Sequence, residues 1–105
     1  MIRHVVLFRF RADISAAQRD AFHAAASGLV DLIPAVDRAV AGPALGLQPG
    51  EFDYVLMLDM ADAAAFAAYK AHPAHLRLIE DHVRPCVEAS VRAQVRLDAV
   101  APGSR

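Results

Sequence analysis

The segment YKAHPAHLRLIEDH, residues 69–82, contains a tyrosine and three of the five histidines of the chain. Imidazole titrates near neutral pH, so His75 can act as a general base or acid, and Tyr69 can hydrogen-bond to a developing enolate oxygen. On an unbroken helix, residues six apart point roughly 240° away from each other. Pro73 interrupts the helix between these two residues, and the break can turn both side chains toward one cavity.

The same pattern has a structural interpretation. His72 can cap the helix that starts at Pro73, and His75 can be a hydrogen-bonding residue in its first turn. His4 lies in an apolar strand, where it is either a satisfied interior histidine or part of the pocket. Tyr54 either donates a hydrogen bond into the cavity or only packs. His23 and His82 are expected to be solvated.

A transition-metal site is not expected. His72 and His75 are three residues apart without a third ligand nearby, whereas zinc-binding helices use histidines four apart with a glutamate. The sequence therefore predicts no resident metal and no cofactor, and it leaves open a magnesium ion on surface oxygens.

The elements that position these residues follow the order strand, helix, strand, strand, helix, strand. Ser15 and Gln18 form a capping-box pattern at the start of the first helix, and Pro34 ends it. Pro73 interrupts the second helix, and Arg84-Pro85 ends it after an apolar stripe of Leu76, Ile79 and Val83. The predicted strands are 2–10, 35–42, 52–60 and 90–98, and the predicted helices are 15–33 and 62 onward.

Two right-handed crossovers place both helices on the same face of the sheet. The predicted fold is therefore α+β and ferredoxin-like, βαββαβ, with a four-stranded antiparallel sheet. Strands 2–10 and 52–60 are apolar on both faces, although a sheet with one wet face should alternate apolar with polar residues. We expect a second copy to cover the open face and form a homodimeric α/β barrel.

The composition favours a single small domain in the cytoplasm. The chain has 105 residues and a net charge of −1, without a basic patch for nucleic acid or a span for a membrane. Its single cysteine excludes an internal disulfide and fits a reducing compartment. We expect the domain to cover residues 1–98 and residues 99–105 to form a flexible tail.

Three segments together resemble the stress-responsive A/B barrel (Dabb) family: MIRHVVLFRF, DYVLMLDM and AYKAHPAH. The resemblance spans about residues 1–98. It implies the dimeric α/β-barrel fold, which the family shares with small monooxygenases and polyketide cyclases. In a polyketide-cyclase branch, a tyrosine and the second histidine of His-Pro-x-His form an acid–base pair in an aldol cyclisation.

By this resemblance the acid–base pair corresponds to Tyr69 and His75, and a strand histidine of the same pocket corresponds to His4. This chain has Ala26 where that branch has a tyrosine, and Tyr54 where it has a histidine, so the resemblance implies a different pocket wall. With His72 and Tyr54 as binding residues, the site would accept a small, mostly apolar keto or phenolic molecule.

Three functions are compatible with the sequence. The first is cofactor-independent acid–base catalysis, such as polyketide-type cyclisation or the cofactor-free oxygenation of a phenol. The second is a stress-related binding protein without turnover, in which the histidines only complete the structure. The third is a structural oligomer built from dimers, which would expose a further apolar patch outside the dimer contact.

Overall fold

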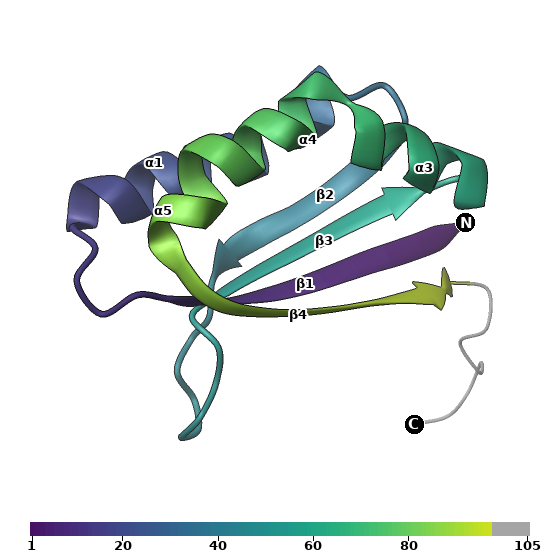
Figure 1. Cartoon of the computed structure of the whole chain (residues 1–105). Helices are drawn as coiled ribbons and strands as arrows, with labels where there is room; N and C mark the ends of the chain where they lie inside the picture. The colour runs from purple at the N-terminus through teal and green to yellow at the C-terminus, as the bar shows by residue number, and fades with distance from the viewer. Residues whose placement is uncertain (98–105) are drawn as a thin grey trace.

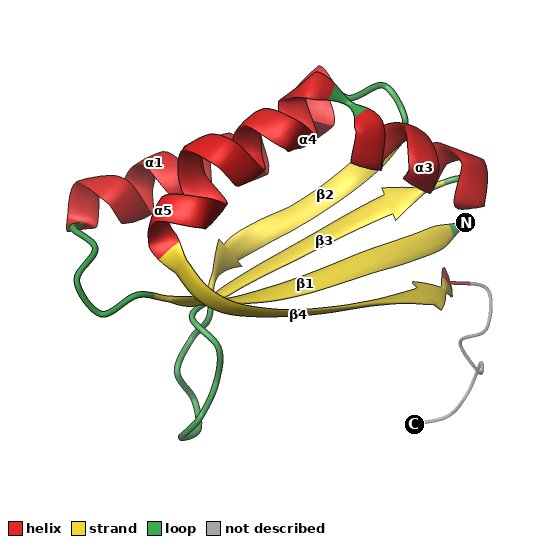
Figure 2. Cartoon of the chain, viewed as in Figure 1, coloured by secondary structure: helices red, strands yellow, loops and turns green. Residues whose placement is uncertain are grey.

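The computed structural model describes residues 1–97, in which a layer of helices covers one face of a four-stranded sheet (Figures 1 and 2). The strands are ordered β2-β3-β1-β4, and all neighbours are antiparallel. The ferredoxin-like prediction is confirmed. In chain order the elements are β1 Ile2–Phe10, α1 Ala16–Ser27, α2 Leu29–Leu32, β2 Val36–Pro43, β3 Tyr54–Met60, α3 Ala63–Ala71, α4 Pro73–Leu78, the π-helical turn η1 Ile79–Val83, α5 Arg84–Cys86 and β4 Val87–Arg96.

The first helix begins with the predicted capping box and is shorter than predicted. The Ser15 hydroxyl accepts the Gln18 N–H at 3.1 Å, and the Gln18 side chain accepts the Ser15 N–H at 2.8 Å. The prediction of one helix over 15–33 is wrong, because Gly28 separates α1 from α2. Glycine has the lowest helix propensity after proline, so a helix is easily interrupted there.

The second helical stretch begins at Asp62, whose carboxylate accepts the Ala65 N–H at 2.9 Å. His72 is extended (φ −68°, ψ 138°), and its Nδ1 accepts the Ala74 N–H at 3.0 Å, so it caps α4. The extended residue resets the helical phase, and α4 therefore buries Ala74 and Leu78. The predicted inward position of Leu76 is wrong, since its exposure is 53%.

The helical stretch continues past Arg84-Pro85, where the sequence predicted its end. The wider turns of η1 precede Pro85, which falls in the first turn of α5. Proline is tolerated at the first turn of a helix, because its missing N–H has no helical partner there. The helix ends at Cys86, and β4 follows directly.

The two faces of the sheet have different surroundings. His4, Val6, Phe8 and Phe10 of β1 are buried beneath the helices. The alternate residues of β1 point to the opposite face, which no helix of the described chain covers (Figure 1). On that face Val91 and Val95 are 49% and 52% exposed, and Val40 is 51% exposed. An apolar, uncovered sheet face agrees with the sequence.

One carboxylate is buried near the end of β3, at a position that points to the open face of the sheet. Asp59 is 3% exposed and accepts two hydrogen bonds from Arg3, at 2.7 and 3.0 Å, and one from Arg38 at 3.2 Å. The hydrogen bonds from Arg3 hold the pKa of Asp59 below its usual value. This cluster joins β2, β3 and β1, and sequence reasoning did not identify it.

The β1 strand has the predicted bounds, and β2 is shifted by one residue. The β3 strand begins two residues later than predicted, and β4 begins three residues earlier and ends two residues earlier. The β4 strand begins at Val87 because its pairing with β1 starts opposite Phe10. The predicted tail, 99–105, lies outside the described residues. No helix within residues 1–97 is long and apolar enough to cross a membrane.

Candidate active site

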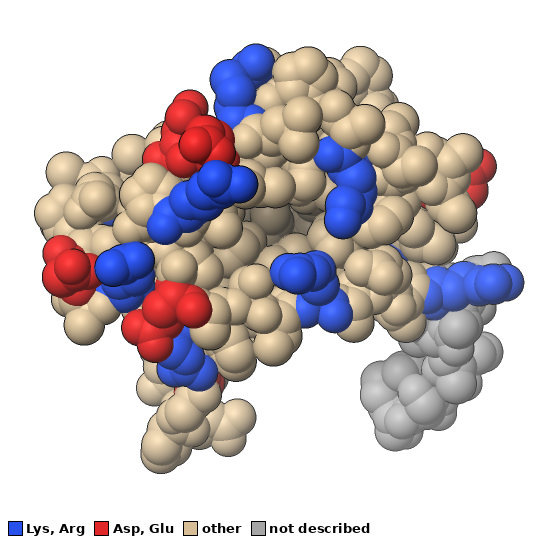
Figure 3. Space-filling view, viewed as in Figure 1, with Lys and Arg blue, Asp and Glu red and all other residues tan. Residues whose placement is uncertain are grey.

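A cavity of about 320 Å³ lies between the sheet and the second helical stretch. Its lining is mostly apolar, with side chains from β1, β3, α3, α4, η1 and β4. Figure 3 shows a hollow in this face of the molecule, with basic side chains on its rim. The polar or titratable residues of the lining are His4, Tyr69, Lys70, His75, Ser90 and Arg92.

His75 has a defined tautomer when it is neutral. Its Nδ1 lies 2.9 Å from the main-chain carbonyl oxygen of Lys70. A carbonyl can only accept, so Nδ1 carries the proton and Nε2 keeps a free lone pair. Partial burial lowers the pKa of His75, although the hydrogen bond to Lys70 opposes this shift. The neutral ring is therefore favoured at pH 7, as a general base requires.

Tyr69 lies beside His75, as the break at Pro73 predicts. The two ring centroids are 4.5 Å apart, and both side chains line the cavity. Tyr69 is 2% exposed, and burial raises the pKa of its hydroxyl to about 12. The hydroxyl therefore stays protonated near neutrality and can donate a hydrogen bond to an oxygen of a ligand.

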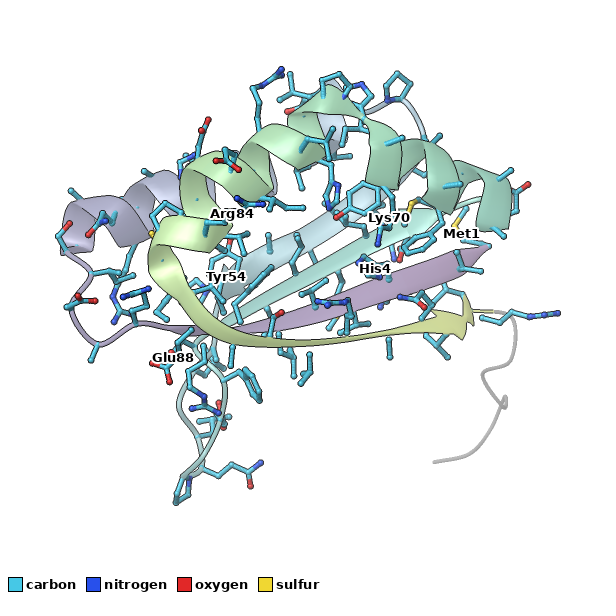
Figure 4. All side chains as sticks on the ribbon, in the orientation of Figure 1. Met1, His4, Tyr54, Lys70, Arg84 and Glu88 are labelled. Atoms are coloured by element: carbon cyan, nitrogen blue, oxygen red, sulfur yellow. The ribbon has the colours of Figure 1, made fainter. Side chains whose placement is uncertain are left out.

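His4 occupies the floor of the same cavity. Its ring centroid lies 5.7 Å from that of Tyr69 and 5.0 Å from that of Phe66. The Gln94 side-chain amide donates to His4 Nδ1 at 2.8 Å, which leaves the proton of the neutral ring on Nε2. Burial, with smaller contributions from the nearby His75, Lys70 and Arg92, lowers the pKa of His4 to about 4. Figure 4 shows His4 and Lys70 in the space between sheet and helices.

The two predicted binding residues do not line this cavity. His72 caps α4, which is the structural alternative considered from the sequence. Tyr54 lies toward the other end of the sheet (Figure 4), where it lines a second cavity of about 260 Å³. Its hydroxyl is 2.6 Å from His23 Nδ1, a contact that the sequence did not predict, although His23 is exposed as expected.

Three residues of the site were missed from the sequence: Lys70, Arg92 and Gln94. Arg92 and Gln94 occupy the polar positions of β4, between Val91, Ala93 and Val95. The sequence shows this alternation but not which set points to the helices, and in the structure the apolar set lies on the open face. Residues 1–97 contain no group of three His, Cys, Asp or Glu side chains that could hold a metal ion.

The fold and the cavity define a class of small α+β proteins with a mostly apolar site beneath the second helical stretch. The family model of the stress-responsive A/B barrel domain matches residues 2–96. The chain therefore belongs to the stress-responsive A/B barrel family. No protein with a curated description matched its sequence.

Similar solved structures share this architecture. A dimeric ferredoxin-like protein of unknown function from Thermobifida fusca is 30% identical, with 91% of this chain and 90% of that chain covered and a TM-score of 0.83. The hydroxynitrile lyase of Passiflora edulis is 21% identical, with 96% of each chain covered and a TM-score of 0.82. SnoaB, a cofactor-independent oxygenase from Streptomyces nogalater, is 17% identical, with 96% of each chain covered and a TM-score of 0.72. The last two show a common fold only.

Proposed function

We propose that this protein binds a small, mostly apolar keto or phenolic molecule and catalyses cofactor-independent proton transfer on it. His75 is the base, Tyr69 is the hydrogen-bond donor, and His4 assists them. The observation that carries this proposal is the hydrogen bond from His75 Nδ1 to the Lys70 carbonyl. It leaves the lone pair of Nε2 free beside a protonated tyrosine in a mostly apolar cavity.

In the proposed step, His75 Nε2 removes a proton from carbon next to a carbonyl group, and the C–H electron pair forms an enolate. The Tyr69 O–H donates to the enolate oxygen, where the negative charge develops. The His4 Nε2–H is a second donor at the cavity floor. In cyclisation, the enolate carbon then attacks a carbonyl of the same molecule, whose π electrons move to its oxygen, and the resulting alkoxide takes the proton from His75. Without cyclisation, the enolate carbon takes the proton back from His75.

Two of the similar structures support chemistry of this kind without assigning it. One is described as a hydroxynitrile lyase and the other as a cofactor-independent oxygenase. An oxygenation that starts with deprotonation of a phenol would use the same base. Polyketide-type cyclisation and cofactor-free monooxygenation therefore remain two versions of one acid–base proposal.

The base can be tested before the natural substrate is known. The α-protons of acetophenone exchange slowly in D₂O, and the exchange can be followed by proton NMR at pH 7.5. We expect the protein to accelerate it, and His75→Gln to reduce the acceleration by about a hundredfold, the usual contribution of a positioned base. Tyr69→Phe should reduce it by roughly tenfold, because one donor to the enolate is lost.

His82→Gln is the matched control, since His82 does not line this cavity. Circular dichroism and thermal unfolding should show that all variants are folded. If the wild-type protein does not accelerate exchange, or if His75→Gln is as fast as wild type, the catalytic proposal is wrong.

We also propose that the protein is a homodimer formed through the open sheet face. The half-exposed valines of β4 and β2 support this assembly, because water would otherwise contact an apolar sheet. The loop between β2 and β3 extends away from the helices (Figure 1), and its Leu45 and Leu47 are both 82% exposed. Similar structures are described as dimeric.

A structural oligomer is the second candidate, and one observation favours it. Leu32 and Leu76 on the helical layer are 57% and 53% exposed, away from the open sheet face. Such residues could contact other dimers. Light scattering distinguishes a dimer from a larger assembly.

A further inference from the structure

The charges around the cavity have one sign. Lys70 and Arg92 line it, and no aspartate or glutamate among residues 1–97 does. Lys70 belongs to the last turn of α3 and Arg92 to β4, so the helical layer and the sheet each provide one cation. The Lys70 ammonium lies 5.9 Å from the ring centroid of Phe66, another residue of the lining.

Neither cation has a carboxylate partner among residues 1–97. Other arginines of the chain do have one: Arg3 and Arg38 pair with Asp59, and Arg84 pairs with Glu80 at 3.3 Å. Within the described part of the chain, the Arg92 guanidinium donates to the Ser90 hydroxyl at 3.2 Å and keeps several other donors free.

Two unpaired cations beside a mostly apolar cavity create a positive potential inside it. His4 experiences this potential, because both cations contribute to lowering its pKa. A bound anion would be attracted by both side chains, and the low polarity of the lining would strengthen the attraction. Guanidinium groups match the planar geometry of a carboxylate, with which they form two parallel hydrogen bonds.

We propose that the ligand of this cavity is an apolar organic acid whose carboxylate lies between Lys70 and Arg92. Its apolar part contacts the aliphatic lining, including Val6, Leu56 and Leu78. This inference rests on the proposed function, since it assumes that the cavity binds a small molecule, and it adds the chemical class of that molecule.

The test compares 2-naphthoate with its neutral isostere, 2-naphthamide, by isothermal titration calorimetry. For the wild-type protein we expect the acid to bind about tenfold more tightly than the amide at low salt, as two partly exposed charge-assisted contacts would provide. The difference should shrink as ionic strength rises, because salt screens the cations.

Two variants locate the effect. Lys70→Met and Arg92→Met should each reduce the preference for the acid severalfold, and the double variant should remove it. The Lys70 substitution keeps the main-chain carbonyl that holds His75. Arg77→Met is the control, because Arg77 is on α4 but does not line this cavity.

A spectroscopic measurement is independent of affinity. Lys70 is the only lysine in the sequence, so reductive methylation with ¹³C-formaldehyde labels one side chain besides the terminal amine. We expect 2-naphthoate, and not the amide, to shift the ¹³C resonance of the labelled dimethylammonium group, since an adjacent carboxylate changes its surroundings.

The outcomes are distinct. If both compounds bind equally and the variants change nothing, the cavity binds small molecules but the anion inference is wrong. If neither compound binds, the proposed binding function fails, and the inference fails with it. A preference for the acid that survives in the double variant would place the anion elsewhere and would also overturn the inference.

Discussion

His4 and His75 show how the surroundings of a residue set its chemistry. Both are held neutral at pH 7, since burial lowers the pKa of each. Their hydrogen bonds fix opposite tautomers: His4 Nδ1 accepts from Gln94, whereas His75 Nδ1 donates to a carbonyl. One imidazole thus retains an Nε2–H donor, and the other retains an Nε2 lone pair.

We predict that His4 makes the stability of the fold depend on pH. Its pKa falls from 6.5 to about 4 on folding, so the unfolded chain binds the proton more readily between these values. The free energy of unfolding should therefore decrease as the pH falls from about 6.5 to about 4, by up to about 3 kcal/mol. Urea denaturation at several pH values measures this change.

His4→Gln should remove more than half of that dependence, and the remainder should come largely from His75, whose pKa is also lowered. His82→Gln should leave the dependence unchanged. Equal pH slopes for wild type and His4→Gln would show that His4 is not held neutral by the fold.

At the residue scale, the sequence predicted the three groups that meet in the cavity, and it missed several of their partners. Tyr69, His75 and His4 could be selected because their side chains titrate or donate and because their positions match the residues that the family resemblance implies. Lys70, Arg92 and the Asp59 cluster could not, because charged residues in such a sequence usually face water. The contact between Tyr54 and His23 could not be predicted either, because it depends on how α1 packs on the sheet.

The break between α3 and α4 is the element on which the site depends. His72 leaves the helical conformation and caps α4, and Pro73 fits the first position of the new helix. The carbonyl of Lys70, at the end of α3, then becomes available to His75.

We predict that Pro73→Ala lets the two helices join. The flanking residues are mostly good helix formers, and alanine restores the missing N–H. A joined helix would place Tyr69 and His75 on different sides. The helical signal at 222 nm should rise, while acetophenone exchange should fall by at least about tenfold.

His72→Asn is the comparison, since asparagine is also a good cap and preserves the break. Unchanged exchange in Pro73→Ala, together with a rise in helicity, would show that the break does not position the proposed acid–base pair.

The pattern of apolar residues and caps predicted the order of the elements, and the fold follows from that order. The errors have local causes. Gly28 divides one predicted helix into two, and the π-helical turn carries the last helix through Pro85. Leu78 points inward and Leu76 outward because the helical phase changes at His72. Apolar periodicity that is followed across such a break cannot predict which residues point inward.

For the whole molecule, the open sheet face is the feature that requires a partner. Val91 lies opposite Leu7 on that face, and it is half exposed in the single chain. A second copy would bury it against another apolar surface.

We predict that Val91→Asp raises the dissociation constant of the dimer at least about a hundredfold, because each interface would bury two unpaired carboxylates. Size-exclusion chromatography with light scattering measures the mass. Leu76→Asp is the control: Leu76 is similarly exposed, but it lies on the helical layer, so this variant should remain dimeric. A monomeric wild-type protein at micromolar concentration would refute the dimer.

The hollow seen in Figure 3 opens directly at the surface of the chain. A molecule can therefore enter and leave without movement of a helix, and the proposed reaction would not be limited by such a movement. The same openness admits water. An enolate formed there would be shielded from water mainly by the apolar part of its own substrate. Substrates with a shorter apolar part should therefore lose more of their product to protonation by solvent.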